Sequence, residues 1–100
     1  MQSSYEPSFV RDMGCTPREW LQWLPEAIGE RRWSLEPQRA QVQLDGPARL
    51  VLRWRELPPR VIALMRMPRL EVCFEFEHTT AEQRYAFMKR FDLYMQRGGG

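Results

Sequence analysis

The feature that most constrains this fold is a change in hydrophobic period along the chain. From Arg32 to Glu77, apolar residues alternate with polar ones, which is the pattern of strands that bury one face; the part before Arg39 could begin the first strand early, with Pro37 at a bulge or an edge. The segments at 16–29 and 80–97 instead carry apolar residues three and four positions apart, as amphipathic helices do. Because helices with one apolar stripe pack well on a half-buried sheet, this order predicts an α+β fold.

Turn-forming residues divide the alternating region into four strands. Asp45-Gly46-Pro47, Glu56 to Pro59 and Pro68-Arg69 are the predicted turns. The strands between them are placed at residues 39–44, 48–55, 60–67 and 70–77. Short connections favour an antiparallel meander. We therefore predict a two-layer sandwich in the order α-β-β-β-β-α, with one N-terminal and one C-terminal helix packed on one face of a four-stranded sheet.

Both helices have recognisable N-terminal signals. Thr16 and Glu19 form a capping box, in which each side chain bonds the other residue's backbone amide, and Pro17 occupies the first helical position. Pro25 is expected to break or kink this helix after about Trp23, and Gly29 offers a C-terminal stop. Its predicted buried stripe is Trp20, Leu24, Ala27 and Ile28. A second capping box, Thr80 with Gln83 or Thr79 with Glu82, begins the last helix, whose predicted stripe is Phe87, Met88, Phe91, Tyr94 and Met95.

Cys15 allows two interpretations. It directly precedes the Thr16 cap, so it can form a hydrophobic staple with Trp20 at the fourth helical position. Alternatively, a helix N-terminus lowers the pKa of a nearby thiol and could make Cys15 reactive. A nucleophilic thiol also needs a base, and the only histidine, His78, is far away in the sequence. The sequence therefore favours the structural staple.

The strand pattern assigns side chains to the two sheet faces. Trp54, Phe74 and Phe76 fall on the face that the helices should cover. With Pro68-Arg69 as a two-residue turn, Arg66 would oppose Glu71 and Arg60 would oppose Glu77. The same register would pair core residues of the two strands, namely Met65 with Val72, Ala63 with Phe74 and Val61 with Phe76.

This register also predicts an apolar strip on the second, otherwise polar sheet face. Val51, Leu64 and Cys73 would line up across three adjacent strands, with Ile62 beside Leu64. An apolar centre with an arginine-rich rim is typical of interfaces. We therefore predict an interaction module that contacts a protein partner or a second copy of itself as a homodimer. The predicted interface residues are Val51, Ile62, Leu64, Cys73, Arg49 and Arg53. An alternative is that the strip is covered by Tyr5, Phe9, Val10 and Met13 of residues 1–13.

Nucleic-acid binding is a second hypothesis. Arg49, Arg53, Arg55 and Arg60 would form a basic side of the sheet. The element order resembles that of double-stranded-RNA-binding domains, with one strand extra. In that family the start of the second helix is basic, whereas here it reads HTTAEQR and contains Glu82.

An enzyme is a third hypothesis. The chain contains no Gly-rich phosphate loop, zinc-protease motif or nucleophile elbow. Cys73, Glu75 and His78 are close in sequence, and a cysteine–histidine pair can form a nucleophile. Cys15, Cys73 and His78 could bind a metal only if the fold brought them together. These patterns favour a binding protein over an enzyme, and we expect no cofactor and no metal.

The whole chain has the properties of one small domain, which we expect to span residues 1–97, with 98–100 as a flexible glycine tail. No stretch is long and apolar enough to cross a membrane, and the N-terminus lacks the features of a secretory signal. We therefore expect a bacterial-type cytoplasmic protein with reduced cysteines and no membrane partner.

Overall fold

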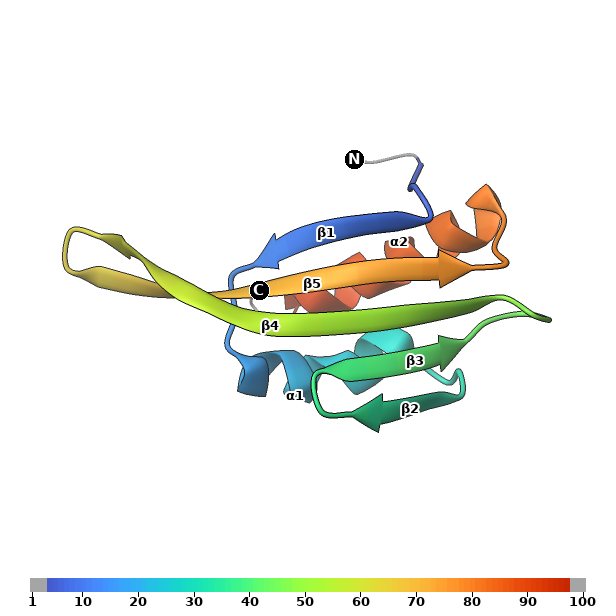
Figure 1. The fold of residues 1–100 in the computed structure, drawn as a ribbon, viewed down its shortest axis with the longest axis horizontal. Coiled ribbons are helices and arrows are strands. Elements are labelled where there is room, and N and C mark those ends of the chain that lie inside the picture. Colours follow the sequence, from blue (N-terminus) through green and yellow to red (C-terminus); the bar gives the residue numbers. More distant parts are fainter. Residues whose placement is uncertain (1–3, 98–100) are drawn as a thin grey trace.

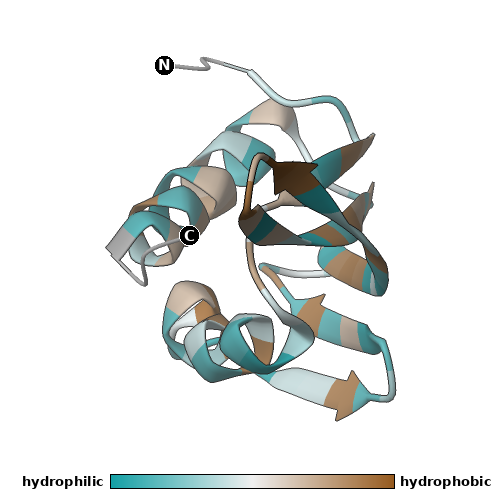
Figure 2. Ribbon diagram, turned by 90° about the vertical axis from the view of Figure 1, so that its left-hand side faces the viewer, coloured by the Kyte–Doolittle hydropathy of each residue, from teal (hydrophilic) through white to brown (hydrophobic). Residues whose placement is uncertain are grey.

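The computed structural model describes residues 4–97. The elements follow the order β1 (Ser8–Met13), α1 (Pro17–Ile28), β2 (Trp33–Glu36), β3 (Arg39–Gln43), β4 (Arg49–Ile62), β5 (Met65–Glu77) and α2 (Ala81–Arg97). The strands form one antiparallel sheet in the order β1-β5-β4-β3-β2. Both helices cover one face of it (Figures 1 and 2). The α+β class with an antiparallel sheet and two helices is confirmed, but the sheet has five strands rather than four.

The two strands that the sequence did not predict lie at the edges of the sheet. Residues 8–13 do not fold over the second face; they pair with β5 as strand β1, with Phe9 opposite Phe74. The segment before β3 turns at Gln38, which has a positive φ of 60°, and pairs back on β3 as β2. Edge strands bury fewer side chains, so their alternation is weak in the sequence.

The predicted strand at residues 60–67 does not exist as a separate strand. Strands β4 and β5 form one long hairpin that turns at Ala63-Leu64, where Ala63 has a φ of 54°. The predicted turns at residues 56–59 and 68–69 are therefore wrong. Pro58 and Pro59 lie at a bulge of β4, between Leu57 and Arg60. Prolines fit there because β3 pairs with β4 only as far as Arg53, so their missing N–H groups interrupt no ladder on that side.

The core lies between the helices and the inner face of the sheet, as the strand pattern predicted. Trp54, Phe74 and Phe76 are all buried. Their rings contact the helices, with centroid distances of 5.5 Å from Trp54 to Trp20, 5.5 Å from Phe74 to Phe91 and 6.0 Å from Phe76 to Phe87. The pairing itself differs from the prediction, because the inner-face partners are Leu50 with Phe76, Leu52 with Phe74 and Trp54 with Val72.

The helix signals are confirmed, with one correction. The Glu19 amide donates to the Thr16 hydroxyl at 3.1 Å, and the Thr16 amide donates to the Glu19 carboxylate at 2.9 Å. The predicted stripe of α1 is buried. However, Pro25 does not end the helix near Trp23, since α1 continues to Ile28 and is capped by Gly29. Thr80 and Gln83 form the second capping box, at 2.8 and 3.1 Å.

The described part of the chain contains no helix that is both long and apolar enough to cross a bilayer. The predicted glycine tail at 98–100 falls outside residues 4–97, which are the residues described here.

Candidate functional site

The end of the β4–β5 hairpin projects beyond the rest of the sheet (Figure 1). Strand β3 pairs with β4 only up to Arg53, and β1 pairs with β5 only down to Leu70. Residues 57–69 therefore form a ribbon of two strands with no third strand on either side. We refer to residues 57–69 as the arm.

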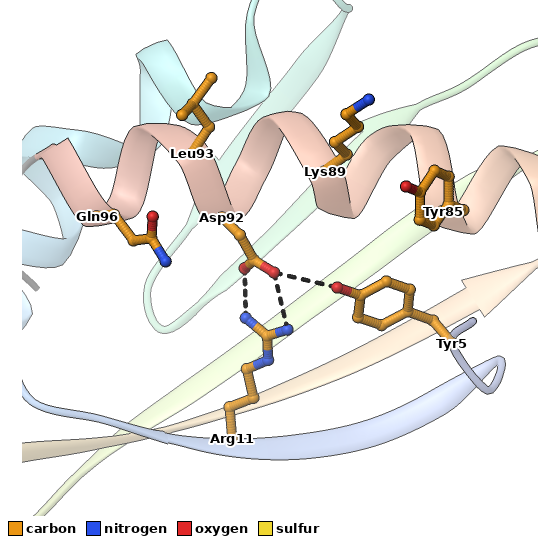
Figure 3. A pocket seen from close by; sticks show the side chains of 7 residues that line it. All are labelled: Tyr5, Arg11, Tyr85, Lys89, Asp92, Leu93 and Gln96. Carbon is orange, nitrogen blue, oxygen red and sulfur yellow. Dashed lines mark hydrogen bonds and ion pairs between the residues drawn. The ribbon is translucent and has the colours of Figure 1, made fainter. Parts of the chain in front are cut away.

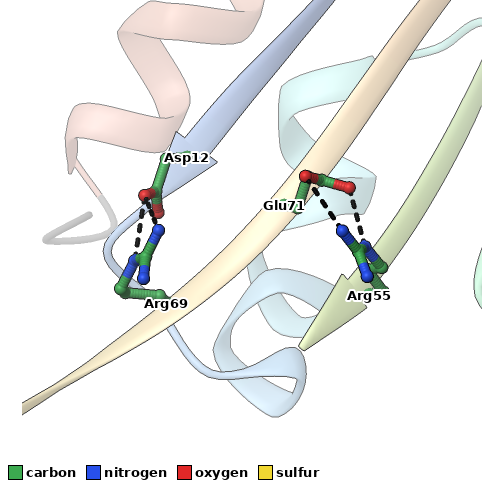
Figure 4. Close-up of polar contacts among 4 residues, drawn as sticks. All are labelled: Asp12, Arg55, Arg69 and Glu71. Carbon is green, nitrogen blue, oxygen red and sulfur yellow. Dashed lines mark hydrogen bonds and ion pairs between the residues drawn. The ribbon is translucent and has the colours of Figure 1, made fainter. Parts of the chain in front are cut away.

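Two ion pairs lie at the base of the arm (Figure 4). The Arg55 guanidinium donates to Glu71 at 2.8 Å, between β4 and β5. The Arg69 guanidinium donates to Asp12 at 2.9 and 2.6 Å, between β5 and β1. Hydrogen bonds from these arginines lower the pKa of Glu71 and of Asp12 below their ordinary values. One pair thus joins the two strands of the hairpin at the base of the arm, and the other connects the arm to β1.

The tip of the arm is apolar and open to solvent. Nine large hydrophobic residues are exposed in the described part of the chain, and five of them lie between residues 61 and 67. Leu64, at the turn, is 100% exposed. The others are Val61, Ile62, Met65 and Met67. In Figure 2 the arm points toward the viewer, and its end has the colour of hydrophobic residues. We call these five residues the apolar tip.

The apolar tip extends around the ribbon rather than along one face. Directly opposed residues and residues two apart share a face, so Ile62 and Met65 lie on the same face as Met67. Val61, opposite Arg66, lies on the other face, and Leu64 caps the end. An element that presents apolar groups on both faces and at its end suits insertion into a surrounding medium better than contact with a flat surface.

Arginines flank the rear of the tip on both faces of the ribbon. Arg60 lies opposite Met67 on one face, and Arg66 lies opposite Val61 on the other. Between Leu57 and Leu70 the sequence contains three arginines and no acidic residue. Within residues 4–97, neither Arg60 nor Arg66 forms an ion pair or a hydrogen bond through its side chain. We call Arg60 and Arg66 the arginine collar.

The edges of the arm are poorly suited to pairing with another strand. Pro58 and Pro59 remove two backbone donors from β4, and Pro68 removes one from β5. Prolines and bulges are common means by which proteins prevent edge-to-edge association. We therefore expect contacts made by the arm to come mainly from its side chains.

The apolar strip predicted on the second face is not present as expected. Val51 lies opposite Glu75 and Gln41, while Cys73 lies opposite Arg53 and Val10. The alignment of Val51 with Leu64 and Cys73 is therefore wrong, because Ile62 and Leu64 belong to the arm tip. The predicted ion pairs of Arg66 with Glu71 and of Arg60 with Glu77 are wrong for the same reason.

The outer face of the sheet instead carries cross-strand ion pairs. Arg49 pairs with Glu77, Arg53 with Glu75 and Arg55 with Glu71. The arginines proposed to contact nucleic acid are, apart from Arg60, thus neutralised within the chain, and this weakens the nucleic-acid hypothesis.

The residues considered for thiol or metal chemistry lie apart. Cys15 is buried in the core cluster, whereas Cys73 is partly exposed on the outer face. Burial, with a smaller contribution from Glu19, raises the pKa of Cys15 to about 11. This supports the staple interpretation over a reactive thiol. His78 is exposed beyond the end of β5, and no group of three metal-binding side chains occurs among residues 4–97.

A groove between β1 and α2 was not predicted from the sequence (Figure 3). It has a volume of about 480 Å³ and is lined by Tyr5, Arg11, Tyr85, Lys89, Asp92, Leu93 and Gln96. The Arg11 guanidinium donates two hydrogen bonds to Asp92, one of them at 3.1 Å, and the Tyr5 hydroxyl donates a third at 3.2 Å. One feature of the sequence could have indicated this groove. Arg11 is charged, although it alternates in step with Phe9 and Met13, which face inward.

This half-buried network attaches β1 to α2. Burial opposes the charge of Arg11, but hydrogen bonds from Arg11 to Asp92 and the charge of Asp92 raise the pKa of Arg11 above its usual value. Burial, together with the charge of Asp92, also raises the pKa of Tyr5. Because its charges are paired internally, we interpret the network as structural.

No protein-family model matches the sequence, and no curated protein is significantly similar to it.

Proposed function

We propose that the protein is a small docking module whose arm inserts its apolar tip into a complementary surface. The observation that carries this proposal is the concentration of exposed apolar side chains at the end of the β4–β5 hairpin, which projects from the two-layer body. Contiguous exposed apolar groups of this kind usually mark interaction sites, because their contact with water is unfavourable. The predicted role as an interaction module is kept, but its contact residues are moved to the arm.

The outer face is a weaker candidate for the contact. Val51 is only 3% exposed, and the arginines around it are engaged with Glu75 and Glu77. A partner would have to break these ion pairs to reach an apolar surface. In contrast, the tip can be buried without disrupting any side-chain hydrogen bond or ion pair formed within residues 4–97.

We place the module in the cytoplasm, since its two cysteines, Cys15 and Cys73, are unpaired and stay reduced in that compartment. No catalytic role is included in the proposal, because the candidate nucleophiles and ligands do not meet in a common site.

Photo-crosslinking in living cells tests the docking role. A photoreactive amino acid is placed at Leu64 of the full chain, and in a control variant at Leu35, another exposed leucine on strand β2. We expect several-fold more adduct from position 64, whether the adduct is a protein, a lipid or a second copy. Equal yields at the two positions would contradict the proposal.

A further inference from the structure

We infer that the surface into which the arm inserts is a lipid bilayer carrying anionic headgroups. This inference rests on the proposed docking role of the arm and names the chemistry of its partner. It requires no membrane-spanning segment, so it is compatible with the absence of a spanning helix among residues 4–97. It does replace the expectation from the sequence that no membrane is involved.

The distribution of apolar groups around the tip favours a bilayer over a protein groove. A groove on a protein surface is normally filled by one face of a ligand, whereas a bilayer surrounds whatever enters it. The tip presents Val61 on one face and Ile62, Met65 and Met67 on the other, with Leu64 at the end. All of these are aliphatic or thioether side chains, which the hydrocarbon region accepts without unsatisfied polar atoms.

The positive charges of the arm are placed where they can contact anionic headgroups. Arg60 lies level with Met67 and Arg66 level with Val61, so the arginines flank the rear of the tip on opposite faces of the ribbon. Their guanidinium groups can form bidentate hydrogen bonds with phosphate while their stems lie along apolar surface. The lack of any Asp or Glu between Leu57 and Leu70 avoids repulsion from an anionic surface.

The length of the arm between its arginines and the turn also fits a bilayer. From the pair Arg60–Met67 to the turn, the strand covers between three and four residues, or roughly 10 Å at the usual rise. Interfacial elements insert their apolar parts by roughly 5–10 Å, to the boundary between headgroups and acyl chains. Arg60 would therefore lie at the level of the headgroup phosphates when the tip is fully inserted, and Arg66, one residue nearer the turn, would reach them along its stem.

A second copy of the chain fits the tip less well. The groove beside α2 provides tyrosine and leucine side chains, but it also presents Lys89. Its acid, Asp92, is already paired with Arg11. A receptor for a tip with a basic collar should instead have unpaired acids at its rim.

Flotation with lipid vesicles tests the inference. The full-length protein is mixed with vesicles of phosphatidylcholine alone, or of phosphatidylcholine with phosphatidylglycerol, at low and high salt. We expect partitioning into the anionic vesicles that decreases with salt. Replacing both collar arginines (Arg60→Gln with Arg66→Gln) should weaken partitioning about 30-fold, from roughly fivefold for each arginine. The matched control removes two exposed arginines elsewhere (Arg18→Gln with Arg32→Gln) and should have a much smaller effect.

The apolar contribution is tested with a second pair of variants. Leu64→Gln should reduce partitioning by at least about tenfold, because the end of the tip would no longer be apolar. Leu93→Gln, at an exposed leucine of α2, should leave it unchanged. Binding that depends on charge but not on Leu64 would show surface adsorption without insertion and would overturn the inference.

The outcomes separate this inference from the docking role on which it rests. If the protein does not bind anionic vesicles but position 64 still crosslinks preferentially to a protein, the lipid inference is wrong and the docking role remains. If light scattering shows a dimer that Leu64→Gln dissociates, the occupant is a second copy and the lipid inference is again wrong. If neither vesicle binding nor preferential crosslinking is found, both are wrong.

Discussion

Arg53 reaches diagonally across the sheet to form an ion pair with Glu75, although its direct cross-strand neighbour is Cys73. Glu75 itself lies opposite Val51, so the pair spans the position of that valine. This relationship explains how Val51 can be almost fully buried on a face with no helix above it. The hydrocarbon parts of long charged side chains can cover an apolar residue while their heads remain in water.

Val51 should therefore behave as a core residue despite its place on the outer face. We expect Val51→Ala to lower the free energy of unfolding by about 1–2 kcal/mol, from the two methyl groups removed from a buried site. Leu64→Ala, at the fully exposed turn, should change it by less than about 0.5 kcal/mol. Urea denaturation of the two variants measures both values. Equal effects would show that Val51 is not covered by its neighbours.

The case of Val51 also illustrates what the sequence could and could not predict. Period and parity correctly placed Trp54, Phe74 and Phe76 against the helices, because burial of one face imposes alternation on the central strands. The same parity placed Val51 on the outer face, but it could not show that charged neighbours would cover it.

The candidate site was harder to predict because prolines occur both in turns and at the unpaired edges of strands. Prolines usually mark turns, so the sequence predicts turns at Pro58, Pro59 and Pro68. In the structure they lie within a ribbon whose outer edges are unpaired, so their missing donors do not interrupt pairing with a third strand. An arm is distinguished from a turn by the points at which β1 and β3 stop pairing with the hairpin. The local sequence does not show these points.

The ion pairs at the base of the arm should be sensitive to acid. Arg69 and Arg55 lower the pKa of Asp12 and of Glu71 in the folded state, so each carboxylate adds stability above its unfolded pKa. That stability is lost as the pH falls through the lower, folded values. We expect carboxyl carbon NMR titrations to show both residues titrating below their ordinary range. Arg69→Gln should raise the pKa of Asp12 and leave that of Glu71 nearly unchanged, whereas Arg55→Gln should do the reverse. A common shift of both carboxyls would indicate a general charge effect instead of two separate pairs.

The network between β1 and α2 should control both stability and the ionisation of Tyr5. Asp92→Asn keeps the shape of the side chain but removes the charge that faces Arg11 and Tyr5. We expect it to lower the free energy of unfolding by about 1–2 kcal/mol, since the pair is only partly shielded from solvent. The pKa of Tyr5 should fall toward its ordinary value, because Asp92 no longer disfavours the phenolate, while burial still keeps it raised. NMR titration of the tyrosine ring carbons measures this, with Tyr85 of the same groove as an internal control. An unchanged Tyr5 pKa would mean that burial alone causes the shift.

Cys15 should be unreactive in the folded protein because it is fully buried and its pKa is raised to about 11. A neutral thiol is a poor nucleophile, so alkylation by iodoacetamide at pH 8 should modify Cys73 first and Cys15 only after unfolding. The Cys73→Ser variant isolates the buried thiol, and its alkylation rate should rise steeply at the urea concentration where the protein unfolds. Cys15→Ala should lower the free energy of unfolding by about 1 kcal/mol, through lost packing beneath the Thr16 cap. Rapid alkylation of Cys15 in the folded Cys73→Ser protein would contradict the staple and restore the reactive-thiol interpretation.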